Sequence, residues 1–113
     1  MTVELINIVK INLLGPFNRG FYYLNTNVEA GDFVEVEFGR QKMHGICTEA
    51  FATTEDKLEV KIEKLKSVGE IVYKNICSEQ FLKFLSQVAE YNMLPFGNVL
   101  EIALPAILTK QVK

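Results

Sequence analysis

The sequence is poor in the residue types that catalytic and metal centres require. Its 113 residues include no tryptophan and one histidine, His44, and the sequence around that histidine gives no hint of a nucleophile partner, so we expect no catalytic site. The two cysteines, Cys47 and Cys77, lie far apart and outside any CxxC pair, which leaves zinc-binding and thioredoxin-like functions without support. We expect both to be buried thiols in a reducing cytoplasm.

The chain also lacks an excess of positive charge and any long apolar run. Its formal net charge is −2, whereas a protein that grips many phosphates usually carries a basic excess, so a nucleic-acid contact would have to be local. No segment reaches the roughly 20 apolar residues of a membrane span, and no signal-peptide pattern opens the chain. Gly15 and Gly20 do not form a phosphate-binding loop because Phe21 follows, and we expect no cofactor in this domain.

What the chain does have is apolar and aromatic content, at 49% and 11% of its residues. That is enough to bury a core, and the length fits a single domain over residues 1–113. The pattern changes from strand-like over residues 1–73 to helical over residues 78–108. We therefore predict an α+β fold, a small β-barrel-like or curled antiparallel sheet followed by two short helices.

A predicted hairpin over residues 28–46 is the centre of this fold. Between Asp32 and Gly39, apolar Val34, Val36 and Phe38 alternate with carboxylates, which indicates a strand with one buried face. A glycine follows and can adopt positive φ. The polar residues after it, Arg40, Gln41 and Lys42, predict a basic tip, and residues 43–48 predict the returning strand.

Three further strands are expected. Residues 3–12 are rich in Val and Ile, and residues 58–71 alternate between apolar and charged side chains from Val60 onward, although residues 54–65 could also begin as a helix. The segment 19–24, RGFYYL, holds three adjacent aromatics. In an extended chain Phe21 and Tyr23 would share one face and Tyr22 would point to the other.

The C-terminal third predicts helices. Ser78 is suited to cap a helix that ends near Tyr91 or Asn92, and a second short helix is expected from Asn98 until Pro105 interrupts it. The sequence after this proline shows no stop signal, which favours a domain of a longer protein.

Two functions from different classes fit this pattern. Aromatic side chains beside a glycine-tipped basic hairpin are suited to capture single-stranded nucleic acid by stacking and local charge. The alternative is a non-catalytic barrel that docks another protein or another domain and has no DNA affinity of its own. An enzyme would require a deep pocket with clustered, strongly shifted titratable groups.

The order of five sequence blocks resembles a known family. FYYL, VEAGDFVEVEFGRQ, HGI, LKSV and PFGNVLEIALP follow one another between Ile8 and Leu108 as they do in the N-terminal DNA-binding domain of primosomal protein N′ (PriA), the bacterial replication-restart helicase. The resemblance implies a non-catalytic module that binds the 3′ end of the nascent leading strand at a stalled fork. It also implies contact with the rest of a helicase chain and with other primosome proteins.

The resemblance also implies DNA-binding residues. The pocket of the family falls on Phe21, Tyr22, Tyr23, Gly39 and Lys66, and Arg40 and Lys42 are expected farther out along the strand. Tyr22 stands where the family pattern has an aspartate. A phenol accepts fewer hydrogen bonds than a carboxylate and offers a π-face, so we expect Tyr22 to stack on the terminal base.

Overall fold

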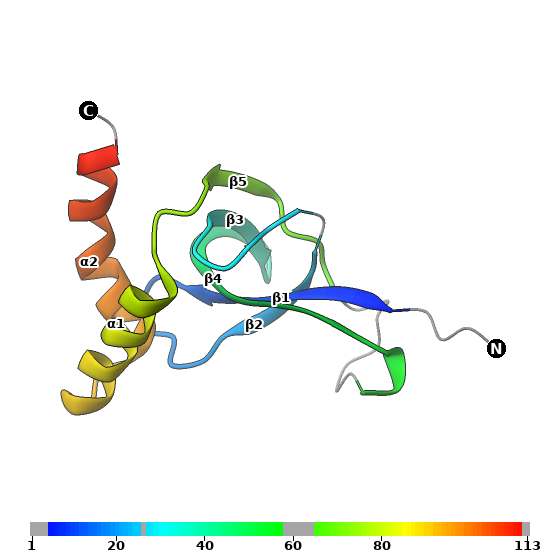
Figure 1. Cartoon of the computed structure of the whole chain (residues 1–113), viewed down its shortest axis with the longest axis horizontal. Helices are drawn as coiled ribbons and strands as arrows, with labels where there is room; N and C mark the ends of the chain where they lie inside the picture. The colour runs from blue at the N-terminus through cyan, green and yellow to red at the C-terminus, as the bar shows by residue number, and fades with distance from the viewer. Residues whose placement is uncertain (1–4, 26, 58–64, 112–113) are drawn as a thin grey trace.

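A computed structural model of the chain describes residues 5–25, 27–57 and 65–111. Its larger part is a five-stranded antiparallel sheet in the order β2-β1-β4-β3-β5. The strands are β1 (Ile6–Leu13), β2 (Phe21–Leu24), β3 (Phe33–Phe38), β4 (Gln41–Thr53) and β5 (Glu70–Tyr73). Figure 1 shows the sheet curled around itself, with both helices on one side.

The segment that leads into β5 brings the two edges of the sheet close together. Leu24 on the edge strand β2 forms a parallel bridge with Ser67, and its N–H donates to the Lys66 carbonyl at 2.9 Å. Two residues later, the Gly69 N–H donates to the carbonyl of Glu35 on β3 at 3.0 Å. Only this segment, and no pairing of β2 with β5, joins the two edges among the described residues. The sheet is curled and not closed, which confirms the predicted α+β class and curled antiparallel sheet.

The inside of the curl is filled by the apolar face of each strand. On β1 the residues Val9, Ile11 and Leu13 are fully buried, and on β3 the predicted Val34 and Val36 join them, with Phe38 packed against the cluster. This inner core consists of Val9, Ile11, Leu13, Tyr23, Val28, Val34, Val36, Cys47 and Val68. The predicted alternation of β3 is thus confirmed by its packing.

Two helices pack on the outside of the curl. α1 (Glu79–Tyr91) begins after Ser78, whose hydroxyl accepts the Phe81 N–H at 3.1 Å, and Asn92 caps its end, so the predicted bounds are confirmed. The helices bury their apolar faces against Phe33 and Ile46 of the sheet. Within the described residues, no helix is long and apolar enough to span a membrane.

The second helix differs from the sequence-based expectation. α2 (Phe96–Gln111) starts two residues before Asn98 and continues through Pro105, so the predicted interruption is wrong. A proline removes one intrahelical N–H donor, and the turns on either side can sustain the helix at the cost of a local kink. Residues 58–64 of the predicted strand 58–71 lie outside the described residues. Residues 65–69 form no strand apart from the isolated bridge at Ser67, so the prediction is wrong there, and β5 covers only its last two residues.

Two backbone hydrogen bonds position the start of α2 against the loop after β1. The Gly97 N–H donates to the Phe17 carbonyl at 2.9 Å, and the Gly15 N–H donates to the Gly97 carbonyl at 3.1 Å. A Cβ on Gly97 would overlap the carbonyl oxygens of Leu13 and Gly15. Glycine is therefore required where the helix meets the loop after β1.

The carboxylate of Asp32 ties the sheet to the segment that precedes α1. Asp32 is fully buried, and its two oxygens accept the N–H groups of Glu29 and Asn75, each at 2.8 Å. The Lys74 ammonium lies 3.2 Å from the same carboxylate. The preceding Gly31 has φ of +97° and accepts the Ile76 N–H at 3.0 Å, so both residues hold the same linker.

We expect Asp32→Asn to destabilise the fold by about 2 to 4 kcal/mol, because an amide NH2 would face a backbone donor and the Lys74 ammonium would lose its ionic partner and keep only the Asn27 carbonyl among its described contacts. Urea unfolding at pH 7 would measure this. Glu101→Gln removes the same charge from an exposed position on α2 and should change stability little. Equal stability of the two variants would contradict a structural role for the Asp32 carboxylate.

The buried thiols predict a loss of stability in alkali. Burial raises the pKa of Cys47 and of Cys77 to about 11. The folded state therefore holds these protons more tightly than the unfolded state. The contribution of the two thiols to the free energy of unfolding is complete below the unfolded pKa of about 8.5, and it falls as the pH rises toward 11. We expect a declining unfolding free energy over that range, and a shallower decline in a Cys47→Ala/Cys77→Ala variant; parallel profiles would contradict this.

Candidate nucleic-acid interface

The β3–β4 turn places a lysine beside the predicted glycine. Gly39 has φ of +64°, as expected of a glycine turn, and a Cβ built there would meet no atom within 4 Å. The Lys66 ammonium donates to the Gly39 carbonyl at 3.1 Å and to a Glu37 carboxylate oxygen at 3.3 Å. Lys66 reaches this position because the bridge at Leu24 fixes its backbone beside β2.

Tyr23 meets the same turn from inside the curl. Its hydroxyl donates to the Glu37 carbonyl at 3.3 Å, and its ring belongs to the inner core. Burial raises the pKa of Tyr23, so this hydroxyl keeps its proton at neutral pH. Tyr23 is thus a support for the backbone of β3 just before the tip.

Three phenylalanines close the end of the curl next to this turn. Phe21 lies 4.7 Å from Phe38 and 5.9 Å from Phe17 between ring centroids, and all three pairs meet edge to face. The Arg19 guanidinium lies 5.1 Å from the Phe21 ring centre, within cation–π range. We call the connected set the tip site: Phe17, Arg19, Phe21, Tyr23, Glu37, Phe38, Gly39 and Lys66.

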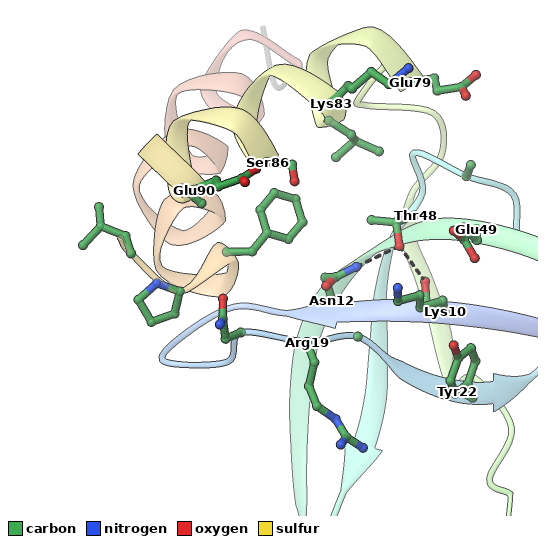
Figure 2. A pocket seen from close by; sticks show the side chains of 18 of the residues that line it. Lys10, Asn12, Arg19, Tyr22, Thr48, Glu49, Glu79, Lys83, Ser86 and Glu90 are labelled. Carbon is green, nitrogen blue, oxygen red and sulfur yellow. Dashed lines mark hydrogen bonds between the residues drawn. The ribbon is translucent and has the colours of Figure 1, made fainter. Parts of the chain in front are cut away.

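Tyr22 does not point into the tip site. It pairs with Lys10 across β1 and β2, meets Phe51 edge to face at 6.0 Å, and has 46% of its surface exposed. It lines a groove of about 1190 Å³ between the outer face of the sheet and α1. Figure 2 shows Lys83 and Ser86 of α1 lining this groove with the sheet residues.

Charges within the groove cancel. Three cations and three carboxylates line it: Lys10, Arg19, Lys83, Glu49, Glu79 and Glu90. At its floor the Asn12 amide donates to the Thr48 hydroxyl at 2.8 Å, so these polar groups already have partners (Figure 2). The groove therefore offers an anion little net attraction.

Arg40 and Lys42 are exposed on the hairpin, as predicted, and Lys42 is the cross-strand partner of Glu37. Sequence reasoning brought together four residues that the structure also gathers in the tip site. It missed Arg19, assigned Phe38 to the core alone and assigned Glu37 to a solvated face. The spacing Arg19-x-Phe21 was the one local signal for the cation–π contact.

His44 has a packing role in this structure. Its ring stacks on Phe33 at 5.3 Å with an interplanar angle of 6°. Among the described residues, no group of three or more His, Cys, Asp or Glu side chains is placed to hold a metal ion.

Small curled antiparallel sheets that present aromatic side chains and cations include domains that bind single-stranded nucleic acid. A comparison with protein families agrees with this class. The family model of the PriA 3′DNA-binding domain (3′BD) matches residues 8–105. This match covers most of the chain, so the chain belongs to the family of PriA 3′DNA-binding domains, and the resemblance drawn from the sequence is confirmed.

Gly39 offers a test of the tip site. Asparagine tolerates positive φ better than other residues, so Gly39→Asn should cost about 1 kcal/mol of stability or less while it fills the open space beside the turn. We expect at least ten-fold weaker binding of a short single-stranded oligonucleotide. Fluorescence anisotropy and thermal unfolding would measure the two effects. Unchanged binding would mean that Gly39 serves the turn alone.

Proposed function

We propose that this domain binds the 3′ end of the nascent leading strand at stalled replication forks, as a non-catalytic module of a bacterial replication-restart helicase in the cytoplasm. The observation that supports this most directly is the contact of Lys66 with Gly39 at the aromatic end of the curl. The rest of the helicase chain and other primosome proteins are the proposed further partners.

Lys66 is suited to meet the terminal phosphodiester. Its ammonium is half-exposed and its ion pair with Glu37 is solvated, with side-chain exposures of 46% and 60%. Exposed ion pairs of this kind contribute about 0 to 1 kcal/mol, so a phosphate can replace the Glu37 carboxylate at small cost. The phosphate would then form a charge-assisted hydrogen bond with the ammonium.

Gly39 and the phenylalanines would receive the sugar and base. The empty space around the Gly39 Cα lets a nucleotide approach the backbone closely, since no Cβ stands in the way. Phe21 and Phe38 are only partly buried and offer ring edges and faces beside it. Stacking of one base on an aromatic side chain contributes about 1 to 3 kcal/mol and is independent of base identity.

Charge limits the site to a few nucleotides. Outside the tip, the outer faces of β3 and β5 carry Glu35 and Glu70 side by side, which would repel a phosphate backbone. A net charge of −2 is compatible with binding when one or two phosphates are contacted. The proposal therefore concerns a terminus and not a long strand.

A second candidate is docking to another protein or domain without DNA affinity. The end of α1 favours some protein contact, because Tyr91 and Met93 are 88% and 93% exposed there. Titration with a single-stranded oligonucleotide separates the two, since docking alone predicts no binding.

Lys66→Ala should weaken oligonucleotide binding more than Arg40→Ala or Lys42→Ala, because Lys66 alone of the three is fixed against Gly39 by described contacts. The logarithm of the affinity should fall with the logarithm of salt concentration with a slope of about one or two phosphates. Anisotropy titrations at several salt concentrations would measure both. A steep slope, or equal effects of the three variants, would indicate an extended electrostatic groove.

A further inference from the structure

Glu37 contacts the tip site through both its main chain and its side chain. Its carbonyl accepts the Tyr23 hydroxyl at 3.3 Å, and its carboxylate lies 3.3 Å from the Lys66 ammonium. The same ammonium donates to the Gly39 carbonyl at 3.1 Å. Lys66 therefore contacts both the Glu37 carboxylate and the turn at Gly39.

This geometry fixes what a ligand at Lys66 would encounter. Any group that approaches the Lys66 ammonium beside Gly39 comes near the Glu37 carboxylate, because the ammonium and the carboxylate are in direct contact. An ionised carboxylate accepts hydrogen bonds and donates none. It would accept a bond from a hydroxyl and repel a second anion.

We propose that Glu37 is a specificity-determining residue that favours a strand ending in a free 3′-hydroxyl over one ending in a 3′-phosphate. This inference rests on the proposed function of the tip site. In this proposal a terminal phosphodiester displaces the Glu37 carboxylate from Lys66. The carboxylate remains on β3 beside the ligand and accepts the 3′-hydroxyl. A 3′-phosphate would add up to two negative charges at the same place and lose that hydrogen bond.

The chain offers a matched control for the charge of Glu37. Glu35 is two residues earlier on β3, carries the same charge and projects from the same outer side of the strand, where it pairs with His44 and Glu70. No described side-chain contact joins Glu35 to Lys66. Glu35→Gln and Glu37→Gln therefore change the net charge equally and differ in their distance from the tip site.

The experiment compares two 5′-labelled oligonucleotides of one sequence, ending in 3′-hydroxyl or 3′-phosphate, by fluorescence anisotropy. We expect the native domain to prefer the hydroxyl, and Glu37→Gln to reduce this ratio of affinities about five-fold, as one unit charge at about 4 Å in water would. Glu35→Gln should leave the ratio unchanged. Glu37→Asp, which keeps the charge, should retain the preference, and thermal unfolding would check that all variants are folded.

Two results would overturn the inference while the proposed function stands. One is an unchanged ratio in Glu37→Gln, and the other is an equal drop in Glu35→Gln, which would show a general charge effect. A third result would overturn the proposed function itself. If the native domain binds a circular single strand as tightly as the linear one, and Lys66→Ala binds both like the native domain, then no terminus is recognised at the tip site.

Discussion

The buried carboxylate of Asp32 is the constraint on which the arrangement of this domain depends. It accepts backbone N–H groups from the turn before β3 and from the segment before α1. The backbone carbonyl of Asp32 accepts the Cys47 N–H from β4 at 3.0 Å. A buried charge is costly unless all its hydrogen-bonding capacity is used. Three segments must therefore meet at this point for the fold to be stable.

That requirement fixes the starting point of β3, and β3 carries the tip site at its other end. From Asp32 the strand runs with Val34 and Val36 inside the curl, so that the turn at Gly39 lies at a set distance from the helices. Tyr23 and Lys66 then hold the backbone and the carbonyl of the turn by hydrogen bonds. The tip site thus sits on a strand anchored at both ends, which favours a preformed binding geometry.

The parts of this fold governed by local pattern could be predicted from the sequence. The alternation of β3, the positive φ at Gly39 and the Ser78 cap depend on neighbouring residues, and the structure has them as expected. Contacts between distant segments do not follow from local pattern, and the family resemblance alone places Lys66 and Gly39 in one pocket. Lys66 meets Gly39 through the parallel bridge beside β2, and α2 continues through Pro105, where local rules favour an end.

The distribution of charge explains how a net acidic domain can present a site for DNA. Fields from exposed charges are screened over about 8 to 10 Å at physiological salt, so an approaching strand responds to the nearest groups and not to the total charge. The groove against α1 is balanced, and the outer side of β3 and β5 carries Glu35 and Glu70. The cations Arg40 and Lys66 lie instead at the hairpin end, and Arg19, which also lines the groove, packs over the Phe21 ring. Under the proposed function a phosphate would approach from the hairpin end, where the outer side of β3 and β5 does not repel it. An approach from one end suits a strand terminus better than the middle of a strand.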